Sequence, residues 1–242
     1  MTAKCRGVIV LLAALCHGSA GAEEPRLALH ANVALAAGEL SFDTTRTLSV
    51  LSRDVSVRAS YALDAGLGFD LGLQLALTSN VALRASFSRV TREGNGVLHA
   101  DLPPLPFGLP RTLDATLPNG RVEESAGHLD LVLGGGAGSV RGSVFGGVTL
   151  FDLDARLLGP ATIMVPGVPP IPIGTSTVLE TSDSPTGWNA GLGLDVRLSA
   201  HLGLGAFLRY AHARATLDPP GFEPIEVDAG GAHAAAGIRV YF

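Results

Sequence analysis

Apolar and polar residues alternate with a period of two along most of the chain, and the pattern is clearest over residues 66–78. Phe69 and five leucines, at 67, 71, 73, 75 and 77, share one face of this segment. The other face carries glycines together with Asp70 and Gln74. Because side chains alternate across a β-strand, this pattern predicts a strand with one apolar and one polar face.

The same alternation predicts eight strands in all, and their connections alternate between short and long. Short turns are expected near 79, 136 and 200. Longer loops are expected near 50, 107, 170 and 222, and they include residues 43–63 with the flared tops of two strands. Residues 93–120 and 157–179 are each predicted to be loops because both contain five prolines, which lack the backbone donor of a sheet ladder.

The last strand is expected over residues 229–242, where Ile238, Val240 and Phe242 continue an apolar row of alanines. A membrane barrel must pair its last strand with its first, because unpaired backbone cannot face lipid. This ending resembles the closing strand of bacterial outer-membrane barrels. The resemblance implies that Ile238, Val240 and Phe242 form the signal that the barrel-assembly machinery recognises.

Together these features predict an all-β fold, an eight-stranded antiparallel transmembrane up-and-down β-barrel. Beyond the N-terminal region, no apolar run approaches the roughly 18 residues that a membrane helix needs. The rival fold is a soluble periplasmic lipocalin-like barrel. In that fold the leucine rows would point inward, and Asp70, Asp195 and Arg197 would lie outside.

Residues 1–22 are predicted to be a cleaved signal peptide, and residues 23–242 the barrel domain. Lys4 precedes a short apolar run and a small-residue cleavage site, and both cysteines lie within this leader. Cleavage of the leader removes Lys4 and Arg6, which changes the formal net charge from −5 to −7. An acidic mature chain disfavours nonspecific binding to nucleic acid.

Nearly the whole mature chain resembles the OmpA-like family of small outer-membrane β-barrel proteins. The residues that carry the resemblance are the glycine-rich hairpins 66–87 and 187–210 and the closing strand. The resemblance implies the outer membrane of a Gram-negative bacterium as the location and its lipid as the surroundings. It says little about activity, since similar barrels include anchors, narrow pores, adhesins and a few lipid-modifying enzymes.

Several charged residues fall on the faces predicted to line the lumen. The predicted charge network comprises Asp70, Arg84, Asp130, Arg141, Asp195, Arg197, Arg209 and Arg239, with His128 and His233 on the same faces. One interpretation is a set of ion pairs that fills the barrel, because isolated buried charges are costly. The other is a selectivity lining whose arginines draw anions through a narrow pore.

The sequence predicts no enzyme, no cofactor and no metal site. His99 and His212 are possible bases and Ser86 and Ser88 possible nucleophiles, but no diagnostic spacing connects them. His128 and Asp130 share a face, but two possible ligands are too few to form a metal site.

The function favoured by the sequence is therefore a structural or loop-mediated role with a closed or narrow lumen. The alternative is a small porin for anionic solutes, and an outer-leaflet lipid enzyme is less favoured. Extracellular partners are expected at residues 93–120 and 157–179. The aromatic residues Trp188, Tyr210, Tyr241 and Phe242 are expected at the membrane interfaces.

Overall fold

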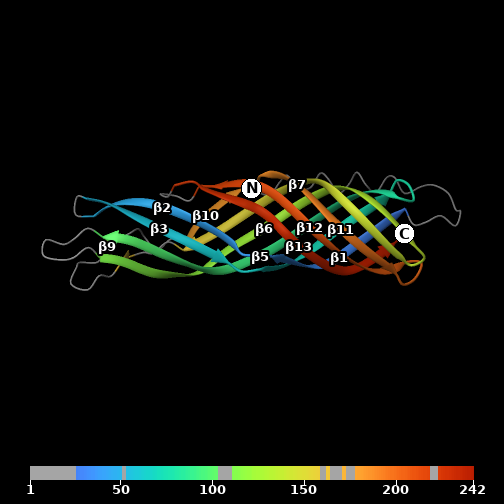
Figure 1. Ribbon diagram of the computed structural model, residues 1–242, viewed down its shortest axis with the longest axis horizontal. Coiled ribbons are helices and arrows are strands. Elements are labelled where there is room, and N and C mark those ends of the chain that lie inside the picture. The colour runs from blue at the N-terminus through green and yellow to red at the C-terminus, as the bar shows by residue number, and fades with distance from the viewer. Residues whose placement is uncertain are drawn as a thin grey trace.

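In the computed structural model, eight passes of the chain close into one elongated antiparallel barrel (Figure 1). The structure describes residues 26–50, 53–102, 111–158, 162–163, 171–172, 178–218 and 223–242. The predicted signal peptide lies outside these residues. The described part of the chain contains no helix that is long and apolar enough to cross a membrane.

The ring of the barrel runs through β1, β4, β5, β6, β7, β11, β12 and β13, and β13 pairs with β1. The bounds of the strands are β1 Leu27–Ala37, β2 Leu40–Val50, β3 Arg53–Leu63, β4 Gly66–Ala76, β5 Val81–Leu102, β6 Arg111–Ala137, β7 Val140–Leu158, β8 Thr162–Ile163, β9 Ile171–Pro172, β10 Val178–Asp183, β11 Thr186–Arg197, β12 Leu202–Leu217 and β13 Ile225–Tyr241. β2, β3 and β10 prolong β1, β4 and β11, so the prediction of an eight-stranded antiparallel barrel is confirmed.

The closing seam joins the first and the last strand that the structure describes. β13 pairs with β1 from Ala28↔Tyr241 to Ala37↔Ala232, and the Phe242 amide donates to the Leu27 carbonyl at 2.9 Å. The start of β1 and the end of β13 therefore lie at the end of the barrel that carries the short turns, which we call the short-turn end. The opposite, long-hairpin end carries β2, β3 and β9 (Figure 1).

The leucine rows face outward around the part of the barrel nearest the short-turn end. Leu67 is 67% exposed and Leu192 58%, whereas Asp70, on the opposite face of β4, is fully buried. The soluble lipocalin-like alternative requires the reverse orientation and is therefore wrong. An apolar belt around a polar interior is the arrangement of a barrel that spans a lipid bilayer.

Aromatic side chains mark the two edges of this belt. Trp188 and Tyr210 are about half exposed on neighbouring strands, with ring centroids 5.8 Å apart, toward the long-hairpin end. Phe242 is exposed at the short-turn end. Such residues are typical of membrane interfaces.

The polarity of the two faces is exchanged where the strands leave the belt. On β12 the outward residues change from Leu208 and Tyr210 to His212 and Arg214, while the inward residues change from Arg209 to small apolar ones. Along β12 the interior is thus charged within the belt and apolar beyond it.

Two predicted loops are largely strands, so those predictions are wrong. Residues 43–63 pair as β2 and β3 except for a tip outside the described residues. In the segment 93–120, the β5–β6 ladder continues to Leu102↔Arg111. Four of the five prolines that suggested a loop fall within residues 103–110, which lie outside the described part.

These hairpins carry the barrel well beyond the belt. β5 continues 15 residues past the lipid-facing Phe87, or roughly 50 Å of strand at about 3.3 Å per residue. The predicted loop 157–179 begins and ends in strands, at Leu158 of β7 and Val178 of β10, and contains the short β8–β9 pair. Its other residues lie outside the described part.

Candidate functional site

Four charged side chains from four strands meet in the middle of the lumen. Arg84 holds Asp130 with two donors, at 3.0 and 2.7 Å, and Arg209 donates to Asp70 at 3.1 Å. Arg209 also lies 3.7 Å from Asp130, which links the two pairs. The four side chains are at most 6% exposed. Two guanidinium groups therefore balance two carboxylates in a buried layer of zero net charge, which we call the central layer.

Neutral polar groups complete the hydrogen bonding of the two carboxylates. Asn32 donates to Asp70 at 2.9 Å, and His30 lies 3.2 Å from the same carboxylate. Asn189 donates to Asp130 at 2.9 Å. A buried carboxylate with several donors retains much of the stabilisation that water would give, which is why the charge can remain inside.

Two aromatic rings cover the guanidinium groups of the central layer. The Arg84 guanidinium lies 3.8 Å from the ring centre of Phe145, and that of Arg209 lies 4.8 Å from Phe207. These cation–π contacts fill the remaining lumen with apolar surface. The layer therefore packs across the barrel.

A second ion pair continues the polar interior toward the short-turn end. Arg239 donates to Asp195 at 2.8 Å and to the Asn32 side chain at 2.6 Å. Because Asn32 also donates to Asp70, this pair is connected to the central layer. Six of the eight charged residues predicted to line the lumen are joined in this way.

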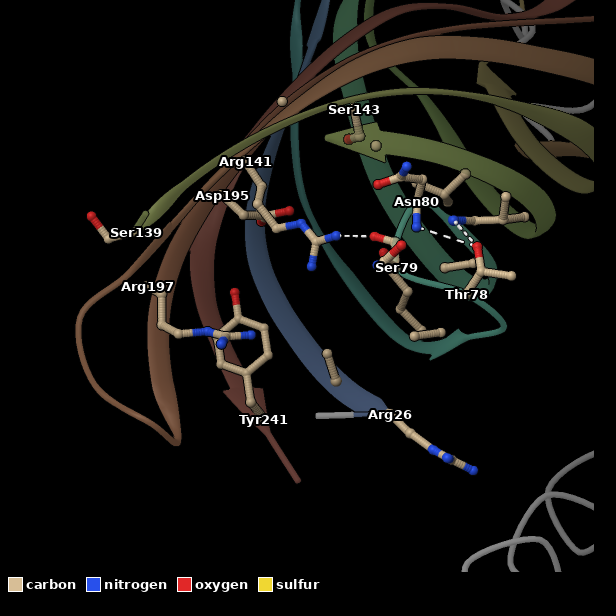
Figure 2. Close-up of a pocket in the computed structure, with 18 of the residues that line it drawn as sticks. Arg26, Thr78, Ser79, Asn80, Ser139, Arg141, Ser143, Asp195, Arg197 and Tyr241 are labelled. Atoms are coloured by element: carbon tan, nitrogen blue, oxygen red, sulfur yellow. Dashed lines mark hydrogen bonds between the residues drawn. The ribbon is translucent and has the colours of Figure 1, made fainter. Parts of the chain in front are cut away.

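The other two, Arg141 and Arg197, lie at the mouth of the short-turn end. They line a polar cavity of about 110 Å³ together with Ser143, Asp195 and Tyr241 (Figure 2). Arg141 donates to the backbone carbonyl of Ser79 across the opening, and the Arg197 guanidinium lies 4.8 Å from the ring centre of Tyr241. We call this cavity the vestibule.

Beyond the central layer, toward the long-hairpin end, come the buried Arg92, Glu124 and His233, with His233 3.6 Å from Glu124, and past them the interior is mainly apolar. Its core packs Phe42, Tyr61, Leu98 and Leu153 against the inward residues of β12 and β13. The rings of Phe42 and Tyr61 are stacked with centroids 5.2 Å apart, and burial raises the pKa of the Tyr61 phenol to about 12. We call this the upper core, and it closes the interior a second time.

The sequence analysis did not predict the neutral polar residues that surround the central layer. His30, Asn32, Thr149 and Asn189 are all buried. The signal was present, because His30 and Asn32 alternate with the outward residues of β1 and Asn32 lies opposite Asp70 in the register. Counting only charged residues on the inward faces left them out.

The possible catalytic residues lie in different environments. Ser88 and His128 are 3.0 Å apart, but both are buried in the lumen and the other ring nitrogen of His128 contacts the Thr149 hydroxyl rather than a carboxylate. Ser86 accepts a hydrogen bond from Arg209. His99 is exposed near Asp114, on the far part of β5.

His212 lies beside Trp188 on the outer surface, with ring centroids 6.3 Å apart. Within the described residues no three His, Cys, Asp or Glu side chains are grouped as a metal would require. The arrangement of the described residues supports ion pairing in the lumen, and the two candidate nucleophiles, Ser86 and Ser88, are buried.

The comparison with solved structures identifies the architecture. The outer membrane protein OprG from Pseudomonas aeruginosa aligns with 92% of this chain and 98% of its own, at 12% identity and a TM-score of 0.56. The fold is that of a small outer-membrane β-barrel. An antiparallel barrel of this kind with a lipid-facing belt resides in the cell outer membrane, with its short turns on the periplasmic side. The vestibule therefore opens to the periplasm.

Two other similar structures have lower scores. Neisserial surface protein A aligns with 89% of this chain and 97% of its own, at 10% identity and a TM-score of 0.45. The outer membrane protease OmpT from Escherichia coli aligns with 89% and 97%, at 8% identity and a TM-score of 0.43. No protein-family profile matches the sequence, and no curated protein matches it either. The OmpA-like family therefore stays a prediction.

Proposed function

We propose that this outer-membrane barrel is a sealed scaffold, without a catalytic step, whose function lies in the hairpins that rise above the membrane. The observation that carries the proposal is the double closure of the interior. The central layer fills the lumen within the belt, and the upper core fills it beyond the belt. A solute would have to displace both ion pairs of the central layer, which is costly because each charge would lose its buried partner.

The extended hairpins are the parts available to the environment. Their outer faces are charged and carry exposed ion pairs such as Arg58–Asp43 and Arg156–Glu180. We propose residues 93–120 and 157–179 as the regions that meet an extracellular partner. We also propose that the closing strand with Ile238, Val240 and Phe242 serves the barrel-assembly machinery.

The alternative is a small porin for anionic solutes, and the arginines of the vestibule favour it. This reading needs the central layer to rearrange so that Arg209 and Arg239 line a passage. Because Asp70 also accepts a hydrogen bond from Asn32, and Arg239 also donates to Asn32, the closed arrangement is the better supported one.

Single-channel recording of the purified protein in a planar bilayer tests the proposal. We expect inserted protein without reproducible conductance steps. Steps whose reversal potential changes when Arg209 or Arg239 is neutralised would instead support the porin. Insertion is checked in the same preparation by protease protection of the membrane belt.

A further inference from the structure

The vestibule combines an excess of positive charge with a closed inner end. Charged groups that act on the Tyr241 phenol include Asp195, Arg197, Arg239 and Arg141. Among these four, three guanidinium groups outnumber one carboxylate, so positive charge is in excess around this hydroxyl. Asp195 is held by Arg239 at 2.8 Å, so its negative charge is already balanced on one side.

The geometry of the vestibule suits a compact anion. Its volume of about 110 Å³ holds roughly three or four waters at about 30 Å³ each, which is also room for one tetrahedral oxyanion. Hydroxyl groups of Ser143 and Tyr241 line the same space as the two arginines. Arg141 and Arg197 come from the neighbouring strands β7 and β11; in Figure 2 Arg141 reaches toward Ser79 and Arg197 lies by Tyr241, whereas Arg26 extends away from both.

We propose that the vestibule is a periplasmic binding site for a phosphate group, held between Arg141 and Arg197. A phosphate monoester carries about −1.5 to −2 charges at pH 7, which suits the positive excess of the site. Guanidinium forks bind such oxyanions through paired charge-assisted hydrogen bonds, and the hydroxyls supply further donors. The phosphate can be free in the periplasm or be the monoester head of an inner-leaflet lipid.

The proposal does not depend on conduction. The central layer lies directly behind the vestibule, so a bound phosphate would stop there in the sealed scaffold. A silent barrel that binds phosphate supports both proposals, and conductance without phosphate binding removes both. A silent barrel without phosphate binding removes this one alone.

The test is calorimetric titration of the full chain, purified from membranes in a maltoside detergent that carries no phosphate. Inorganic phosphate and sn-glycerol 3-phosphate are the two probes. Saturable binding of both supports the phosphate site. Binding of inorganic phosphate alone assigns it to the free ion, and binding of glycerol phosphate alone assigns it to a lipid head. Absence of saturable binding for either probe overturns the proposal.

Variants separate the site from the overall charge. Arg197→Gln should weaken binding about tenfold or more through the loss of charge-assisted hydrogen bonds. Arg197→Lys, which keeps the charge but not the fork, should fall in between. Arg156→Gln removes the same charge at the opposite end and should leave binding unchanged, since this arginine is 66% exposed beside Glu180.

Arg141→Gln is the second test of the site, and far-UV circular dichroism checks that its turn at Ser79 remains folded. Equal affinities for the wild-type protein and Arg197→Gln, or an equal loss in Arg156→Gln, would show that the arginine pair does not form the site.

Discussion

Replacing Arg209 by methionine tests whether the central layer stabilises the barrel. Methionine has a similar length and fills the space, but it removes the donors to Asp70 and Ser86 and the charge 3.7 Å from Asp130. Two buried carboxylates then share one guanidinium group. Loss of one partner of a buried ion pair typically costs about 3–5 kcal/mol.

The contacts that remain place the expected cost near the lower end of that range. Asp70 keeps Asn32 and His30, and Asp130 keeps Arg84 and Asn189. We therefore expect the free energy of unfolding to fall by about 3 kcal/mol. The matched control is Arg156→Met, which breaks an exposed pair with Glu180 and should cost at most about 1 kcal/mol.

The assay is reversible urea unfolding in lipid vesicles, followed by the fluorescence of Trp188, the single tryptophan of the chain. The double variant Arg209→Met with Asp70→Asn restores a balance of one cation and one anion. It should be more stable than Arg209→Met alone. Equal costs for Arg209→Met and Arg156→Met would refute the view that buried ion pairs hold the lumen together.

Three further predictions concern other parts of the barrel. Leu192→Arg places a charge on the lipid-facing belt and should lower the free energy of unfolding in vesicles by about 2–4 kcal/mol. In the same urea assay, Asp152→Arg on the exposed extension of β7 should change the free energy of unfolding by less than about 1 kcal/mol. Gly237→Ala should destabilise the closing seam by about 1–3 kcal/mol, because a Cβ atom there would meet the Ala31 carbonyl oxygen at 1.9 Å. Gly127→Ala is the control, because a Cβ atom at that position has open space. Equal thermal midpoints for the two variants would contradict the predicted clash. The Asp114 carboxylate accepts a hydrogen bond from the His99 ring, which raises the pKa of His99 above its ordinary value near 6.5. Asp114→Asn should therefore lower the midpoint of the His99 NMR titration, and an unchanged midpoint would show that the contact is absent in solution.

The alternation of side chains was sufficient to predict the barrel but not its height. Rows such as Leu67 to Leu77 specify a strand and its lipid-facing side, because the period of two leaves no other arrangement for a belt. Residues 93–102 have weaker alternation, and the prolines that follow them led to the prediction of a loop. The β5–β6 pairing nevertheless continues there, because the upper core stabilises it. Leu98 and Ala100 are buried there, which depends on partners more than a hundred residues away, such as Leu217.

The candidate site was predictable to a similar degree. The inward positions of Asp70, Arg84, Asp130 and Arg209 follow from strand phase alone. Which carboxylate pairs with which guanidinium does not, because Arg209 and Asp70 lie 139 positions apart and meet only through closure of the ring. The displacement of Arg141 and Arg197 to the mouth likewise depends on where their strands end.

The exchange of polarity on β12 has a thermodynamic consequence. The upper core would expose apolar surface to water on unfolding, which gives a positive heat-capacity change. The belt is already solvated by lipid, and the central layer would release polar groups, whose hydration has the opposite sign. The two halves of one continuous barrel should therefore respond differently to cooling: the extracellular half loses stability in the cold while the half within the bilayer holds.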